Sequence, residues 1–245
     1  EISACLVGSE MCIRDSINSI PGVTATRPPS ATDLSDVKIT SYNNKRVDKV
    51  WVEVKMSHTD NLSNPRVFYS DGKWQTTYKT PAAAETVKIL NSSAKAKQFI
   101  KDISKYSGIP EKVIKIPTSK GGLNESGAVP LHVMKSYFSQ PNVNRYIANE
   151  PGMNLGALVT RHYLEGKREP AYYMQAGDDF YMIGKGNPLG LDTAIPVLSG
   201  QGDFKVRVST RSQFYEVQAE IKITKMPDSK YSVKPGTAKK NPFLR

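Results

Sequence analysis

The chain lacks several features that would define its class. No apolar run approaches the roughly 18 consecutive residues of a membrane-spanning helix, so we expect no segment that crosses a membrane. The only histidines, His58, His132 and His162, do not have the H-x-x-H or H-E-x-x-H spacing of zinc sites. The phosphate-loop pattern G-x-x-x-x-G-K-[ST] and the serine hydrolase pattern G-x-S-x-G are also absent. These absences argue against zinc enzymes, P-loop enzymes and serine hydrolases.

Cysteine is nearly absent as well, and both cysteines lie in an unusual N-terminal stretch, residues 5–16. Val7 to Asp15 can be written in the codons GTG GGC TCG GAG ATG TGT ATA AGA GAC, which resemble the end of a sequencing-library adapter. We interpret residues 1–16 as an artefactual, adapter-derived segment, and we expect the natural N-terminal segment to be missing. The remaining residues contain no cysteine, which excludes disulfides and cysteine-ligated zinc there and fits a reducing compartment.

Acidic residues are outnumbered, with 34 lysines and arginines against 23 aspartates and glutamates, a formal net charge of +11. Residues 1–16 carry a net charge of −2, so the rest carries +13. Such a balance favours a polyanion partner, because each phosphate that Lys or Arg neutralises releases counterions. We therefore expect a nucleic acid as the partner.

Hydrophobic periodicity and turn residues predict a mixture of strands and helices. Residues 17–35, rich in Ser, Thr and Pro, are predicted to be a loop or partial N-terminal region, and residues 227–245 a basic, possibly disordered tail. Helices are predicted at 82–90, from Ser92 or Ser93 to Gly108, at 131–138 and at 154–164. Strands are predicted at 37–40, 47–56, 67–69, 74–78, 171–174, 179–183, 204–208 and 214–223. The fold class is therefore α/β (or α+β), with residues 36–226 as one domain.

Two acids and a lysine are predicted to meet on the first hairpin. Asp36 stands at the start of its first strand, and Glu53 and Lys55 project from one face of the second, because residues i and i+2 of a strand share a face. Two neighbouring carboxylates suit Mg²⁺, which prefers oxygen ligands. An ion there can activate water against a phosphodiester, and a lysine beside it can neutralise developing charge.

This arrangement resembles the PD-(D/E)xK nuclease superfamily, through Asp36 and the E-x-K of Glu53-Val54-Lys55. The resemblance implies a restriction-endonuclease-like mixed sheet flanked by helices, here with additional β-hairpins. It further implies that Asp36 and Glu53 hold Mg²⁺ (or Mn²⁺), and that Lys55 assists the attacking water. The implied activity is that of a metal-dependent DNA endonuclease of phage or bacterial type, with DNA as its partner, in the cytoplasm of a bacterial or phage-infected cell. A homodimer is compatible with this expectation.

The sequence departs from the family at two places. Ser35 stands where the family's nominal proline precedes the acid. The family's core also begins with a helix, often carrying a further Glu, and a strand before the acid. In this chain the adapter-like segment and the predicted loop of 17–35 occupy that region, so we expect part of the active site to be lacking.

Accessory residues are predicted from their position near the hairpin or from the family pattern. Ser57 and His58 extend the polar end of the second strand, although a surface histidine is the commoner explanation for His58. A later helix of the family often supplies a polar residue to the site, and Gln98 is a candidate for that role.

A second set of residues competes for the same role. Asp203 precedes Glu220 by 17 residues, the same separation as Asp36 and Glu53, again with a hairpin between, and Lys222 completes an E-x-K. Either set could instead be an exposed strand face with alternating charges. The second hypothesis for function is therefore a non-catalytic basic protein, either a nucleic-acid-binding module or a virion structural component.

Overall fold

The computed structural model describes residues 9–28, 34–56, 62 and 65–244. The protein is mixed α/β, and the described residues form five α-helices, one short 3-10 helix and two five-stranded sheets. The chain forms two compact units. Unit 1 comprises Glu1–Asn61, Asn154–Gln201 and Ile223–Arg245, and unit 2 comprises Leu62–Met153 and Gly202–Lys222. The sequence had predicted one domain over 36–226, whereas the structure divides this stretch between the two units.

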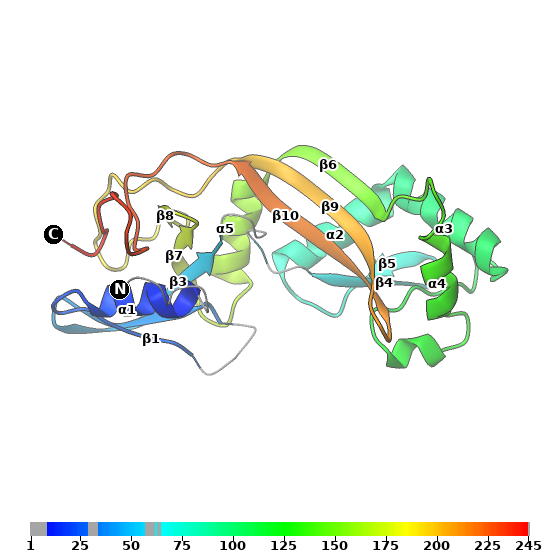
Figure 1. Cartoon of the computed structure of the whole chain (residues 1–245), viewed down its shortest axis with the longest axis horizontal. Coiled ribbons are helices and arrows are strands. Elements are labelled where there is room, and N and C mark those ends of the chain that lie inside the picture. Colours follow the sequence, from blue (N-terminus) through cyan, green and yellow to red (C-terminus); the bar gives the residue numbers. More distant parts are fainter. Residues whose placement is uncertain (1–8, 29–33, 57–61, 63–64, 245) are drawn as a thin grey trace. The chain divides into compact units, whose positions relative to one another are not determined.

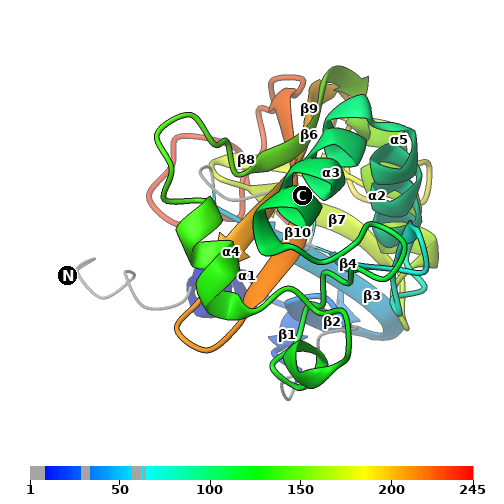
Figure 2. The ribbon, with the colours of Figure 1, turned by 90° about the vertical axis from the view of Figure 1, so that its right-hand side faces the viewer.

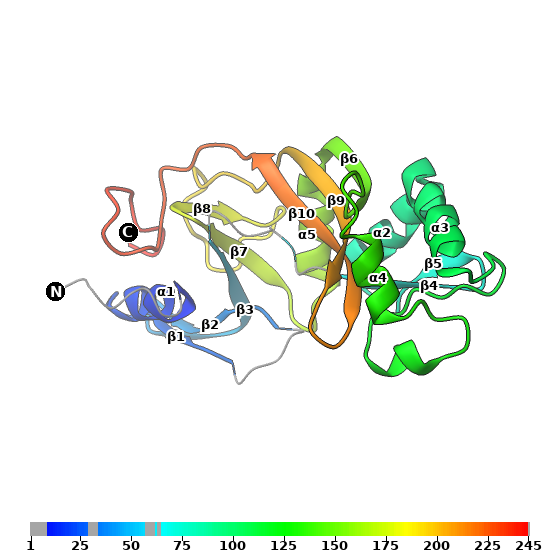
Figure 3. The same ribbon diagram turned by 45° about the vertical axis from the view of Figure 1, so that its right-hand side comes forward.

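Unit 1 contains a sheet with the strand order β1-β2-β3-β7-β8 (Figure 3). Its strands are β1 (Thr24–Thr26), β2 (Val37–Tyr42), β3 (Lys45–Lys55), β7 (Ala171–Ala176) and β8 (Asp179–Met182). Neighbouring strands are antiparallel except β3 and β7, which are parallel. Helix α1 (Ser9–Asn18) precedes β1, and α5 (Leu155–Glu165) precedes β7. The unit therefore has the order α1-β1-β2-β3-α5-β7-β8, interrupted after β3 by unit 2.

A tight turn and an irregularity in the pairing together determine the register of β2 against β3. Asn43 and Asn44 connect the strands with positive φ angles of 53° and 60°. A two-residue loop with both φ positive is a type I′ turn, which matches the twist of a hairpin and tolerates asparagine. The hairpin predicted from the sequence is thus confirmed. An irregularity between Ile39 and Ser41 then shifts the register, so that Val37 pairs with Val52 and Asp36 lies level with the C-terminal end of β3.

One face of β3 packs against the N-terminal helix. Val50, Val52 and Val54 are buried in a single apolar cluster with Ile13 and Ile17 of α1. Figure 1 shows α1, in dark blue, lying close to β1 within this unit. Because strand side chains alternate, the odd-numbered residues of β3 must face the other way, away from α1.

The structure corrects the expectation for the region before Asp36. The predicted loop of 17–35 is wrong at Thr24–Thr26, which forms β1 and pairs with β2, and the end of α1 also falls in it. A helix and a strand thus precede Asp36, where we expected neither. The adapter origin of residues 5–16 concerns the gene and stays a prediction, although the helix begins within that segment and buries Ile13.

The structure also corrects the prediction for the C-terminal segment. Residues 227–244 do not behave as a disordered tail, because Val233 and Phe243 are buried in the cluster that contains α1 and β3. The Phe243 ring lies edge-on to Tyr42 and Phe180, at centroid distances of 6.2 and 5.9 Å. The lysines and prolines of this segment led to the prediction of disorder. A few buried apolar residues are enough to hold it against unit 1.

The second sheet has the order β5-β4-β10-β9-β6 and is formed largely by unit 2. Its strands are β4 (Arg66–Ser70), β5 (Lys73–Gln75), β6 (Tyr146–Asn154), β9 (Gln201–Thr210) and β10 (Tyr215–Lys225). Unit 2 also contains α2 (Pro81–Ser92), α3 (Ala94–Ser107), the 3-10 helix η1 (Gly121–Asn124) and α4 (Leu131–Tyr137). Helices α2 and α3 lie side by side (Figure 2). In the described part of the chain, no helix is long and apolar enough to span a membrane.

The helix boundaries of unit 2 follow their capping residues. Thr80 accepts a hydrogen bond from the amide of Ala83 at 3.3 Å, and Pro81 occupies the first turn of α2. Ser93 caps α3 in the same way, and Gly108 ends it with a φ of 73°. These side chains satisfy amides that have no partner inside the helix. The predicted cap and end of α3 are confirmed, whereas α2 extends beyond the predicted 82–90 at both ends.

Docking of the C-terminal segment is tested by replacing Phe243 with alanine. Because the ring is buried against two other aromatic rings, Phe243→Ala should lower the free energy of unfolding by about 3 kcal/mol. Urea denaturation measures this change. Leu244→Ala is the matched control, since the neighbouring side chain is 51% exposed and should cost less than about 0.5 kcal/mol. Equal stability of both variants would show that the segment is not docked.

Candidate active site

The centre of the candidate site is an ion pair between two residues of one strand. Lys55 Nζ lies 2.6 Å from Glu53 Oε1 on the face of β3 that is opposite α1. Glu53 is only 3% exposed. A carboxylate buried to this degree requires a charged or hydrogen-bonding partner, and the i, i+2 spacing on a strand supplies one. The sequence prediction that Glu53 and Lys55 are neighbours is therefore confirmed.

Helix α5 adds a second contact to the same carboxylate. The hydroxyl of Tyr163 donates a hydrogen bond to Glu53 Oε1 at 3.0 Å. Burial raises the pKa of Tyr163 well above its ordinary value, and the negative charge of Glu53 raises it further. The phenol is thus held in its protonated, donating form. Glu53 Oε1 is fixed between a lysine from its own strand and a tyrosine that is 110 residues away in the chain.

Asp36 reaches the same end of β3 from the neighbouring strand. Its Oδ2 accepts a hydrogen bond from the backbone amide of Val54 at 2.7 Å. Burial and the charge of Glu53 raise the pKa of Asp36 to about 7, although the Val54 amide and the charge of Lys55 oppose this shift. The hairpin therefore brings the two predicted carboxyl groups into electrostatic contact, as the sequence indicated.

The pKa of Glu53 shifts in the opposite direction, downward. Its burial alone would raise the pKa, but the positive charges of Lys55 and Lys167 outweigh burial and lower it. Burial lowers the pKa of Lys55, but the charge of Glu53, its hydrogen bond to Lys55 and the charge of Asp36 together raise it above its ordinary value. At neutral pH Glu53 is therefore ionised and Lys55 is a cation, whereas Asp36 is close to its midpoint.

The donor set fits a divalent cation. Glu53 Oε2 is buried without a hydrogen bond of good geometry among the described residues, although the hydroxyl of Ser35 is near enough to help lower the pKa of Glu53. An ionised buried oxygen without such a bond is costly, and a bound cation would remove that cost and favour ionisation of the nearby Asp36. No three of His, Cys, Asp or Glu converge in the described ranges, so the protein would supply two carboxylates. Mg²⁺ is commonly held by one or two carboxylates with several waters.

Two further residues on and after α5 were missed by sequence reasoning. The positive charge of Lys167 acts on Glu53, and its Nζ lies 5.6 Å from the centre of the Tyr163 ring. His162 is 2% exposed, and burial lowers its pKa to about 4, so it is neutral at physiological pH. The sequence predicted the helix that carries His162 and Tyr163, but no local signal indicates which strand it contacts.

The accessory residues have mixed outcomes. Ser57 and His58 lie outside the described residues. Gln98 is on α3 in unit 2, exposed, and donates a hydrogen bond from Nε2 to Asp102 Oδ1 at 2.8 Å. The polar helix residue that contacts Glu53 is Tyr163 of α5 and not Gln98, because α5 is the helix that precedes the strand parallel to β3.

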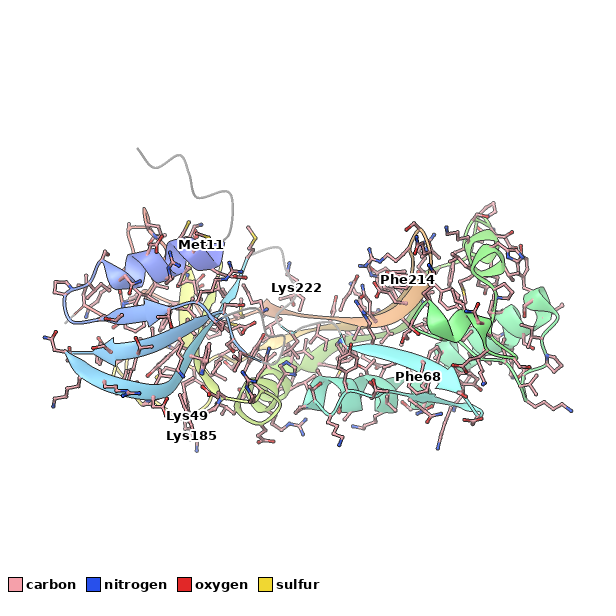
Figure 4. All side chains as sticks on the ribbon, turned by 90° about the horizontal axis from the view of Figure 1, so that it is seen from below. Met11, Lys49, Phe68, Lys185, Phe214 and Lys222 are labelled. Atoms are coloured by element: carbon pink, nitrogen blue, oxygen red, sulfur yellow. The ribbon has the colours of Figure 1, made fainter. Side chains whose placement is uncertain are left out.

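The competing set lies on β9 and β10, where each acid already has its own cationic neighbour. Asp203 is 3.2 Å from Lys205, and Glu220 pairs with Arg207 and accepts a hydrogen bond from Tyr146 at 3.0 Å. Lys222 projects from β10 in Figure 4. The residues of β9 alternate between buried and partly exposed. This pattern matches the alternative explanation, a partly exposed strand face with alternating charges.

Comparison of the chain with protein-family models, with curated proteins and with solved structures gives no match. The interpretation of the site therefore depends on its own geometry and chemistry.

The raised pKa of Asp36 predicts how the stability of the protein depends on pH. The unfolded carboxyl has a pKa near 3.8 and the folded one about 7, so the ionised form costs stability. This cost is absent below about pH 4, grows as the pH rises and is complete above about pH 7. In the presence of a chelator, Asp36→Asn should therefore stabilise the protein by about 2–4 kcal/mol at pH 8 and by far less at pH 4. Urea denaturation at both pH values measures this. A pH-independent difference would contradict the assigned environment.

Tyr163 is tested through its hydroxyl alone. Tyr163→Phe removes the donor to Glu53 and should weaken Mg²⁺ or Mn²⁺ binding by about 10–100-fold, as loss of an orienting partner does. Titration of the ion, followed by calorimetry, measures the affinity. Tyr215→Phe is the matched control, because that buried hydroxyl donates to the carbonyl of Val129 at 2.8 Å in unit 2. Equal losses of ion affinity in both variants would show that Tyr163 has no specific role in the site.

Proposed function

We propose that the protein is a metal-dependent nuclease that hydrolyses phosphodiester bonds of DNA. The observation that carries this proposal is the buried carboxylate of Glu53, which is held by Lys55 and Tyr163 and interacts electrostatically with Asp36. A structural ion pair would not require a second, electrostatically coupled carboxyl group whose pKa is raised to about 7. Perturbed ionisable groups of this kind cluster at functional sites.

The residues divide the chemistry as follows. Asp36 and Glu53 would hold the ion, and Tyr163 orients Glu53. When bound, Mg²⁺ would supply Lewis-acid stabilisation of the negative charge that develops on the phosphodiester. Lys55 remains protonated, since its pKa is raised, so it acts as a cation toward the water or the phosphoryl oxygens rather than as a base.

The order of elements in unit 1 supports the same proposal. The restriction-endonuclease-like fold to which the sequence shows a resemblance has the order αβββαβ, and unit 1 has the order α1-β1-β2-β3-α5-β7-β8, with β3 and β7 parallel. Eight of the ten residues of α1 belong to the adapter-like segment, so the order from β1 onward is what supports the proposal.

Plasmid nicking with Mg²⁺ tests the proposal. Glu53→Gln keeps the size of the side chain and removes its charge, and Lys55→Ala removes the cation, so each should reduce cleavage by at least about 10²-fold. Glu220→Gln is the matched control, because it neutralises a partly exposed glutamate of the competing set and should leave cleavage unchanged. Chelation of the metal should abolish cleavage by the unaltered protein.

Three results would contradict the proposal. Cleavage that survives both Glu53→Gln and Lys55→Ala would exclude this site, and loss only in Glu220→Gln would move the activity to β10. DNA binding without any cleavage in Mg²⁺ or Mn²⁺ would favour the alternative, a non-catalytic nucleic-acid-binding or virion protein.

A further inference from the structure

The positive charge of the protein is concentrated in unit 2. That unit contains 17 lysines and arginines against 9 aspartates and glutamates, a net charge of +8 out of the +11 of the chain. The candidate active site lies in unit 1, with only +3. The basic balance that predicts a polyanion partner is therefore carried mainly by residues outside the candidate active site.

Within unit 2, α3 presents three lysines in one line. Lys97, Lys101 and Lys105 are four residues apart and all exposed. Such spacing places them on one side of a helix, with about 6 Å of rise between successive residues. The opposite side is apolar and packs inside the unit, through Ala96, Phe99, Ile100 and Ile103. We call the three exposed residues the lysine stripe.

The charges of the lysine stripe are not neutralised by acidic side chains nearby in the described part of the chain. None of its three side chains forms an ion pair within the described ranges, whereas most acids of β9 and β10 do pair. Asp102 is the sole acid on α3, and Gln98 binds its carboxylate from the preceding turn. Like charges four residues apart weaken an isolated helix slightly, so helix stability does not explain the stripe.

We infer that the lysine stripe binds the phosphate backbone of duplex DNA. The choice of DNA among polyanions rests on the proposed function. The stripe spans about 12 Å, and duplex DNA carries one phosphate charge per about 1.7 Å of its axis, so three phosphates lie within reach. Lysines are flexible point charges without the planar fork that reads a base edge, and the exposed side of α3 lacks aromatic residues between them. The contact is therefore sequence-independent, and it anchors DNA through unit 2.

The test is fluorescence anisotropy of a labelled 20-base-pair duplex with the full chain, in a chelator that suppresses cleavage. The triple variant Lys97→Gln, Lys101→Gln, Lys105→Gln should bind on the order of 10²-fold more weakly at 0.1 M salt. The slope of log affinity against log salt should fall in magnitude by about 2–3, which is about 0.9 for each lost phosphate contact. Thermal melting checks that the variant folds.

The control is a second triple variant with the same change in net charge, Lys73→Gln, Lys79→Gln, Lys112→Gln. These lysines are also exposed in unit 2 but do not form a line on one helix. We expect a loss of less than about fivefold. An equal loss in both variants would show that binding follows net charge alone, and unchanged affinity in the stripe variant would also overturn the inference. An effect on duplex RNA but not on duplex DNA would overturn the choice of partner.

The outcome is separable from that of the proposed function. Binding in chelator requires no active site, so a stripe effect without any cleavage in Mg²⁺ would leave the inference standing while the nuclease proposal fails. Cleavage by the unaltered protein with no stripe effect would give the reverse result.

Discussion

The site depends on one buried carboxylate that must stay ionised. Glu53 lies inside unit 1, and desolvation works against its charge, but Lys55 lies 2.6 Å away and Tyr163 donates to the same oxygen. Breaking a buried pair by removing one partner typically costs several kcal/mol, because the other charge is left uncompensated. The register of β2 and β3 then determines where Asp36 can lie. Asp36 is buried beside the ionised Glu53, so its pKa rises. A divalent cation is the simplest partner that would allow both groups to ionise together.

Local patterns were enough to predict the parts of this arrangement that are near in sequence. The valines of β3 alternate with Trp51, Glu53 and Lys55, so the strand and its polar face could be predicted, and two asparagines indicate the turn before it. The cap of α3 at Ser93 and its end at Gly108 could be predicted in the same way. The role of Tyr163 could not be predicted, because it is 110 residues away from Glu53 in the chain. Nothing in the periodicity of α5 indicates which strand it covers.

Other errors have physical reasons too. β1 is three residues long and only its middle residue is buried, too short for an alternating pattern to be recognised. The C-terminal segment is mostly polar, yet Val233 and Phe243 dock it through a few tertiary contacts. The two E-x-K sets are indistinguishable by spacing. They differ in burial, since Glu53 is enclosed by unit 1, whereas Glu220 is partly exposed and has Arg207 and Tyr146 as partners. Burial and distant partners are the properties that sequence spacing does not encode.

The central claim is that Asp36 and Glu53 form a cation site. Binding of Mn²⁺ to the DNA-free protein, followed by electron paramagnetic resonance, tests this claim without reliance on cleavage. We predict one specific ion per chain, lost in Glu53→Gln and retained in Glu220→Gln. Equal binding by all three proteins, or no specific binding by the unaltered chain, would contradict the account.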